Sequence, residues 1–175
     1  MADFNEPTVV SLDEVMAGLE GEPSPDYEIT LGITEGSHPA TITKVEAIAV
    51  NLPEKGDKPA VTFHKARITV ELTEPRFSGW ERHIDYPLGK YADGNWADGN
   101  FRTSVRRVLG EAVYANQIAT IPTASGRYKK AFDLLVSRPC EVFFKKNDKG
   151  YVNPVGVLSG ISSESETPVS SGISL

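Results

Sequence analysis

The chain has 175 residues, of which 39% are hydrophobic and 24% charged, a composition typical of a globular protein with one core. No stretch approaches the roughly 18 apolar residues of a membrane-spanning helix, and the start of the chain lacks the basic and apolar pattern of a secretory signal. A lone cysteine, Cys140, excludes an internal disulfide. These features predict a protein of a reducing compartment, the cytoplasm, which for a viral protein is that of the host cell.

The net charge of −6 is unevenly distributed along the chain. Residues 1–35 hold nine acidic residues and no Lys or Arg, whereas residues 36–158 hold all 18 Lys and Arg against 13 acidic residues. This basic body beside an acidic arm suggests a polyanionic partner, with an acidic segment that competes for it or binds elsewhere. An arm that only keeps the protein in solution is the alternative.

Residues 1–37 are predicted to form an acidic arm: a disordered start, a short amphipathic helix, and a linker over residues 20–37 that is rich in Pro, Gly and acids. Ser11 followed by Glu14 matches a capping box at the start of the helix. Gly21 ends the apolar pattern. The apolar residues at helical spacing are Leu12, Val15, Met16 and Leu19.

The pattern changes to β-structure after residue 38. Residues 39–50 are rich in β-branched side chains, residues 60–74 alternate, and residues 80–86 follow a turn, which predicts three strands. In the second strand one face holds Ala66, Ile68, Val70 and Leu72. The other face holds Phe63, Lys65, Arg67, Thr69 and Glu71.

Two helices are predicted next. A loop over residues 87–100, rich in Gly and Asn, precedes a helix from about Phe101, with Asp98 or Asn100 as its N-cap. A second helix is predicted over residues 127–137. The first helix carries one apolar stripe, formed by Phe101, Val105, Val108, Leu109 and Ala112.

The chain then returns to β-structure. Residues 140–146 and 151–158 are predicted to form a hairpin around a turn at residues 147–150, which includes Asp and Gly. Residues 159–175 are rich in serine and are predicted to form a disordered tail.

The order of three strands, a helical segment and two strands is that of the five-stranded OB-fold barrel. We therefore predict a mainly β domain over residues 38–158: an OB-fold-like barrel with two helices inserted between the third and fourth strands, and disordered termini. Other small β-barrels with a helix are also compatible with this order.

Catalysis finds little support in the sequence. There is no CxxC, HxH or HExxH pattern for zinc, no phosphate-binding loop and no nucleophile elbow. We expect a protein that is not an enzyme and needs no metal or other cofactor.

Binding of a single-stranded nucleic acid finds more support. Such proteins pair cations, which hold phosphates, with aromatic rings that stack on bases by about 1–3 kcal/mol each. The least ambiguous cluster is Phe63, Lys65 and Arg67, on the predicted outer face of the second strand. The other candidates lie on the third strand, on the turn and loop that flank it, and on the closing hairpin. They are Arg76, Phe77, Trp80, Arg82, Lys90, Tyr91, Trp96, Lys145, Lys146 and Tyr151.

Structural roles are alternatives for several of these residues. By the alternation of its strand, Trp80 lies on the same face as the inward-facing residues. It follows a turn at the start of the strand, so the sequence is compatible with a core position and with an exposed one. Of Phe143 and Phe144, one is expected in the core and the other at the surface. Lys145 and Lys146 flank a turn, where lysine is common without a function. For three helix residues the alternative is a solvent-facing role: Arg102, Arg106 and Arg107.

The layout of residues 36–158 resembles phage-encoded OB-fold single-stranded DNA-binding proteins of replication and recombination. The likeness is carried by the strands of residues 36–74, the Gly-Trp-Glu-Arg strand at residues 79–82, the helical insert and the hairpin of residues 140–158. It implies a protein that coats and protects single-stranded DNA in the cytoplasm. Bacterial-type relatives end in an acidic tail that recruits other proteins, whereas this tail has two glutamates. The acidic arm is therefore the candidate for recruiting replication or recombination proteins, and a homo-oligomer is left open.

A protein-interaction module, such as a viral inhibitor or assembly factor, is the main alternative. It would use the acidic arm and the exposed sheet face, and removal of the arm would weaken its partner binding. An enzyme without a local signature is the third class.

Overall fold

The computed structural model describes residues 8–21 and 32–161. The chain divides into two units, residues 1–30 and 31–175, and each is described by itself. The predictions of a disordered start, a linker and a disordered tail fall mainly on residues 1–7, 22–31 and 162–175, outside the described residues.

The first unit contains one short helix, α1 (Leu12–Ala17). Its predicted cap is confirmed, because the Ser11 hydroxyl oxygen accepts a hydrogen bond from the backbone N–H of Glu14 (3.3 Å). The helix is shorter than predicted and ends at Gly18. Its apolar residues are all exposed: Leu12, Val15, Met16 and, just beyond the helix, Leu19.

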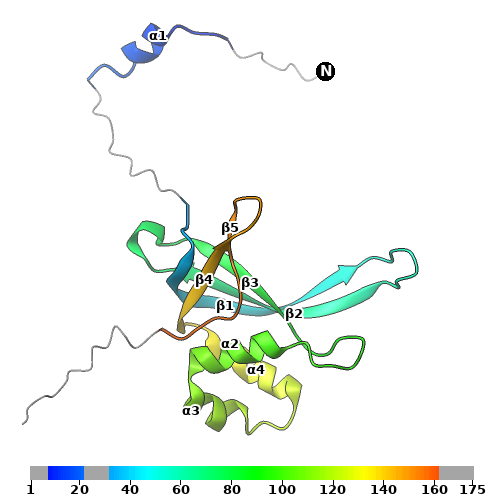
Figure 1. Cartoon of the computed structure of the whole chain (residues 1–175). Helices are drawn as coiled ribbons and strands as arrows, with labels where there is room; N and C mark the ends of the chain where they lie inside the picture. The colour runs from blue at the N-terminus through cyan, green and yellow to red at the C-terminus, as the bar shows by residue number, and fades with distance from the viewer. Residues whose placement is uncertain (1–7, 22–31, 162–175) are drawn as a thin grey trace, which may run out of the picture. The chain divides into compact units, whose positions relative to one another are not determined.

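The second unit is built on a five-stranded antiparallel sheet in the order β3-β2-β1-β4-β5 (Figure 1). The class of fold is therefore as predicted, mainly β with helices inserted between the third and fourth strands. The strands are β1 (Gly36–Leu52), β2 (Val61–Leu72), β3 (Glu81–Pro87), β4 (Pro139–Lys146) and β5 (Val152–Pro154).

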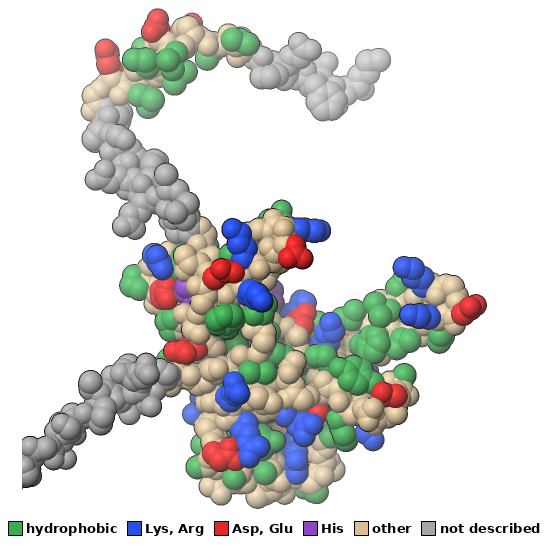
Figure 2. Space-filling model, in the orientation of Figure 1, with side chains coloured by type: hydrophobic (Ala, Val, Ile, Leu, Met, Phe, Trp, Pro, Cys, Tyr) green, Lys and Arg blue, Asp and Glu red, His purple; other side chains and the backbone are tan. Residues whose placement is uncertain are grey.

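The long strand β1 connects the two halves of the sheet. Its first residues pair with β4, and from Ala40 onwards it pairs with β2. A register shift between Ile42 and Lys44 marks the change. The far ends of β1 and β2 continue as a two-stranded ribbon that projects from the body, with Lys and acidic side chains gathered at its tip (Figures 1 and 2).

The segment between β3 and β4 is more helical than predicted. It contains α2 (Gly99–Leu109), α3 (Glu111–Val113), a π-helical turn η2 (Tyr114–Ile118) and α4 (Ala124–Leu135). The sequence analysis missed α3 and η2 and placed α4 three residues too late. The Thr123 hydroxyl explains the earlier start, because it accepts from the N–H of Gly126 (3.1 Å) and caps the helix. The helices lie on one side of the sheet (Figure 1).

One core joins side chains of the sheet, of the turn before β3 and of these helices. The predicted inner face of β2 is confirmed, since Ala66, Ile68, Val70 and Leu72 are buried. Thr69 was placed on the outer face but is also buried, where its hydroxyl lies 3.0 Å from Nδ1 of His83. On α2 the residues Phe101, Val105 and Leu109 are buried as predicted, whereas Ala112 lies beyond the helix and is exposed.

The sheet is open, so the predicted barrel is not observed. No ladder joins β3 to β5; the Tyr86 hydroxyl donates instead to the carbonyl oxygen of Gly156 (2.8 Å). The predicted last strand is much shorter than residues 151–158: β5 ends at Pro154, and after the hydrogen bond from Val155 to Phe143 (2.8 Å) the chain bends at Gly156. The folded body is longer than residues 38–158, since Ile33 is buried and Ser159 pairs with Glu141.

Candidate nucleic-acid interface

The residues predicted to bind nucleic acid occupy four places: β2, the turn before β3 together with the start of β3, the loop after β3, and the β4–β5 hairpin. The β2–β3 ladder runs from the pair Lys65–Pro87 to the pair Glu71–Glu81. At a rise of about 3.4 Å per residue, its two ends are roughly 20 Å apart. The turn and the loop are therefore separate surfaces.

On β2, Phe63, Lys65 and Arg67 share one face, and each is half-buried. Nε and Nη2 of Arg67 donate to the two carboxylate oxygens of Asp85 on β3 (both 2.8 Å). These hydrogen bonds, followed by the charge of Arg67, hold the pKa of Asp85 below its usual range. The charge of Arg67 is therefore largely compensated, whereas Lys65 has no ion-pair partner among the described residues.

The turn cluster is defined as Arg76, Phe77, Trp80 and Arg82. Its ring Phe77 is part of the core, and Trp80 packs against the core. Phe77 is 1% exposed and lies 5.4 Å from the half-buried ring of Trp80, so it cannot stack on a base. This corrects its predicted role: the 3-10 turn η1 (Pro75–Phe77) directs the ring inward against His38 (5.7 Å). Arg76 lies over the ring of Phe77 (4.8 Å) and Arg82 over that of Trp80 (5.5 Å).

The closing hairpin exposes Lys145, Lys146 and Tyr151, and neither lysine has an ion-pair partner among residues 8–21 and 32–161. Tyr151 is 67% exposed. Phe144 is buried and Phe143 is 47% exposed, as their opposite parity predicts. The hairpin thus offers cations and aromatic rings, but on a separate edge of the sheet from the loop after β3 (Figure 1).

The loop cluster, defined as Lys90, Tyr91 and Trp96, follows β3. Lys90 and Trp96 form an isolated β-bridge, and the ammonium nitrogen of Lys90 lies 4.9 Å from the centre of the Trp96 ring. Trp96 and Tyr91 are each 50% exposed. An aromatic surface that is held in place, open to solvent and adjacent to a cation is what base stacking requires.

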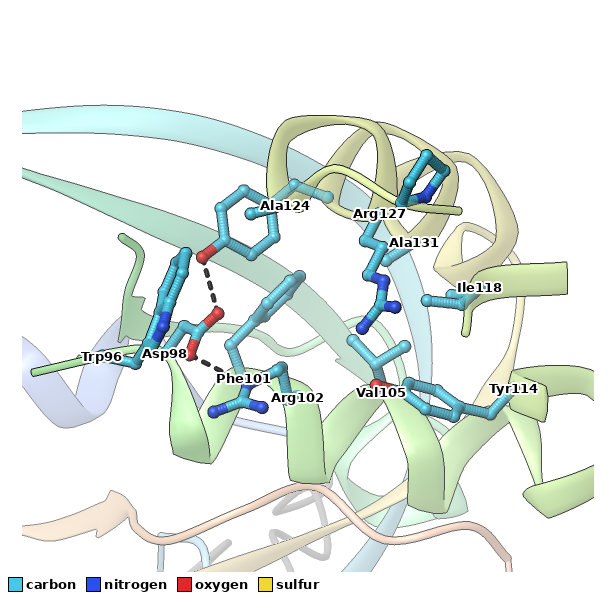
Figure 3. Close-up of a pocket in the computed structure, with 12 residues that line it drawn as sticks. Trp96, Asp98, Phe101, Arg102, Val105, Tyr114, Ile118, Ala124, Arg127 and Ala131 are labelled. Atoms are coloured by element: carbon cyan, nitrogen blue, oxygen red, sulfur yellow. Dashed lines mark hydrogen bonds and ion pairs between the residues drawn. The ribbon is translucent and has the colours of Figure 1, made fainter. Parts of the chain in front are cut away.

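A cavity of about 260 Å³, the insert cavity, opens beside Trp96. Its walls come from the loop, α2, η2 and α4, and Figure 3 shows Phe101, Val105 and Ile118 around it, with the guanidinium of Arg127 directed inward. The cavity is a little smaller than the roughly 300–1,000 Å³ of sites for drug-sized ligands.

Asp98 is the buried polar group at the edge of this cavity, with 2% of its surface exposed. It occupies the N-cap position of α2 as predicted, but its side chain makes no capping bond. One carboxylate oxygen accepts from Nε of Arg102 (2.9 Å) and the other from the hydroxyl of Tyr128 (2.6 Å). The same hydroxyl accepts from the backbone N–H of Gly89 (3.0 Å), so this network joins the loop to both helices.

Burial, and then the hydrogen bond to Asp98, raise the pKa of Tyr128 to about 12. The phenol is therefore protonated at neutral pH and acts as the donor to Asp98. The network fixes the start of α2 and the wall of the cavity in one arrangement.

The sequence analysis did not find the insert cavity or the polar network. Arg102 was identified only as a residue of the solvent side of α2, and Arg127 and Tyr128 were not candidates. The four-residue spacing of Asp98 and Arg102 is visible in the sequence. Tyr128 lies thirty residues away from Asp98, and only the packing of α4 against α2 brings them together.

The chain matches no protein-family model and no curated protein. Among the described residues no helix is long and apolar enough to cross a membrane. Within the same residues no three His, Cys, Asp or Glu side chains gather as a metal site would require.

Proposed function

We propose that the protein binds single-stranded DNA without catalysis and coats it during phage replication or recombination. The observation that carries this proposal is the loop cluster, where Trp96 and Tyr91 are half exposed beside Lys90. Bases would stack on these rings and the cations would hold phosphates, an arrangement that depends little on base sequence.

The topology supports the proposal. The OB-fold is a partly open five-stranded barrel that binds oligonucleotides on its second and third strands and the adjoining loops. Here a bulged first strand is shared between β2 and β4, the helices lie between β3 and β4, and Tyr86 bridges towards Gly156 where a barrel would close. We infer an OB-fold in which a hydrogen bond from one side chain, that of Tyr86, to the backbone of Gly156 stands where strand pairing would close the barrel.

The distribution of charge supports it as well. Lys65 lies on β2 at the end of the ladder from which the loop cluster leaves β3, since Lys65 opposes Pro87. The backbone N–H of Leu88 donates to the carbonyl oxygen of His64 (2.9 Å), which fastens the loop to β2. Lys65 and Lys90 are thus the cations best placed to hold the phosphates of a strand that stacks on Trp96.

Tryptophan fluorescence tests this function, because Trp80 and Trp96 are the two tryptophans of the chain. Oligo-dT added at low salt should quench the emission, and quenching should fall as salt rises because phosphate contacts release counterions. Duplex DNA of equal mass is the control. Trp96→Phe should abolish most of the quenching and Trp80→Phe, its matched control, should not. Absence of quenching together with absence of a gel shift would refute the function.

A protein-interaction module is the second candidate, and α1 is the observation that favours it. The exposed fractions of Leu12 (71%), Met16 (56%) and Leu19 (60%) leave an apolar stripe beside acidic residues. Deletion of residues 1–30 separates the candidates and keeps Ile33, which is buried in the body. DNA binding should persist or tighten if the protein coats DNA. If the protein is an interaction module, DNA binding is absent and partner binding weakens.

A further inference from the structure

The insert cavity has walls suited to a planar apolar group. Aromatic rings of Trp96, Phe101, Tyr114 and Tyr128 line it, together with the small or branched side chains of Val105, Ile118 and Ala131. Phe101 is anchored edge-on against Tyr128 (5.9 Å) and Phe132 (5.8 Å), so this side of the cavity is rigid. Trp96 stands at its edge (Figure 3).

The polar groups of the cavity are mostly donors. Both oxygens of Asp98 are already occupied, by Arg102 and Tyr128. Nε of Arg127 donates a hydrogen bond to the carbonyl oxygen of Ile121 (2.7 Å), and Nη2 donates one to that of Ala119 (2.9 Å). Among the described residues, Nη1 of Arg127 and both terminal nitrogens of Arg102 have no hydrogen-bond partner.

A ligand that matches these walls carries acceptor oxygens on a flat apolar frame. Thymine has two keto oxygens, one on either side of its N3–H, which can accept from free arginine nitrogens, and a methyl group that fits an apolar wall. Cytosine and adenine each present an exocyclic amine with two donor hydrogens, against the single N3–H of thymine, and the cavity has few free acceptors. With two arginines and one carboxylate, the cavity also favours the adjoining phosphate.

We propose that the insert cavity receives one unstacked thymine base from the bound DNA strand, with Trp96 as the stacking platform at its entrance. The proposal rests on the single-stranded DNA binding proposed above and adds a base preference to it. The loop cluster holds the strand whatever its sequence, and the cavity selects one base per protein.

Photochemical crosslinking of the wild-type protein tests where that base lies. In an oligo-dT with 5-iodouracil in place of thymine, iodine occupies the position of the methyl group and crosslinks to an aromatic ring in contact with it. The proposal expects crosslinks to Phe101, Tyr114 or Tyr128 in the digested peptides. Crosslinks confined to Trp96 or to other parts of the chain would overturn it, as would binding without crosslinks.

A cavity-filling variant tests the base preference. Ala124 lines the cavity at the start of α4, and Ala124→Leu fills space there while keeping a good helix former. The matched control is Ser125→Leu, next on the same helix, exposed and not part of the lining. We expect the wild type and the control to bind oligo-dT about tenfold more tightly than oligo-dC, the scale of one good base contact. The filled variant should bind the two alike.

The outcomes separate this proposal from the function on which it rests. Equal affinity of the wild type for oligo-dT and oligo-dC, with strong binding to both, overturns the cavity proposal and leaves DNA coating intact. Failure to bind either oligonucleotide overturns both. If Ala124→Leu loses its native circular dichroism, the crosslinking result on the wild type decides.

Discussion

The turn cluster and the loop cluster are built from the same kinds of residue at opposite ends of the β2–β3 ladder, yet they differ in what they can do. In the turn cluster the rings are stacked inward, with Phe77 1% exposed and Trp80 resting on it. In the loop cluster Trp96 is 50% exposed and rests on no buried aromatic ring of the described structure. Each cluster has a tryptophan beside a cation, but Trp80 packs against the core, whereas the ring of Trp96 is open to solvent and available for stacking.

The physical reason is the course of the chain that carries each ring. The turn before β3 is short and folds back over the ends of β1 and β2, where Thr73 donates its N–H to the carbonyl oxygen of Pro39 (3.1 Å). The loop after β3 instead spans from the sheet to the helices and is held by backbone bonds, such as that from Ala97 to Gly89 (2.8 Å). Its rings are positioned without being buried.

The largest expected effect is a difference in the free energy of unfolding between variants of the two clusters. Phe77→Ala should destabilise the protein by about 3–5 kcal/mol, because it removes a fully buried ring between His38 and Trp80. Urea denaturation followed by circular dichroism measures this loss. Tyr91→Ala, an exposed ring of the loop cluster, is the comparison and should change stability by less than about 0.5 kcal/mol. Equal losses would mean that the two clusters do not differ in this way.

The second expected effect is a difference in DNA affinity between variants of the two clusters. Trp96→Ala should weaken oligo-dT binding by about 1–3 kcal/mol, the contribution of one stacked base, with little change in stability. Trp80→Ala should show the reverse: a loss of stability and an affinity close to that of the wild type once the fraction folded is taken into account. Fluorescence anisotropy of a labelled oligonucleotide measures both. A larger loss of affinity in Trp80→Ala would move the interface to the turn cluster.

The third prediction concerns the network that holds the loop. Tyr128→Phe should cost about 1–2 kcal/mol, because Asp98 and the N–H of Gly89 lose a partner. A raised pKa in the folded state stabilises the protein fully below the unfolded value near 10, and this contribution is lost as pH rises through about 12. Stability should therefore fall less steeply between pH 10 and 12 in Tyr128→Phe than in the wild type, as urea denaturation across that range would show. Parallel curves would contradict the assignment.

The smallest effect distinguishes two cations on β2. Lys65→Gln should lower the slope of log affinity against log salt by about 0.7, the value for one phosphate contact on a single strand. Arg67→Gln should leave that slope nearly unchanged, because Arg67 is already paired with Asp85. Titrations at several salt concentrations measure both variants, each compared with the wild type. A larger change for Arg67→Gln would show that DNA displaces Asp85.

Local patterns in the sequence determined the first four strands, the first long helix and much of the core. Alternation along β2 placed Ala66, Ile68 and Val70 inside, and helical spacing did the same for Phe101 and Val105. These inferences succeed because burial of one face is a property of a single strand or helix and repeats with its period.

The tertiary structure decided which polar and aromatic side chains are available to a partner. Nothing within β2 indicates that Asp85 compensates Arg67, or that η1 turns Phe77 inward. Likewise Asp98, Arg102 and Tyr128 meet because α4 packs on α2, across thirty residues of chain. Pairing and exposure depend on contacts between elements, which are set by register, loop length and packing rather than by the period of any one element.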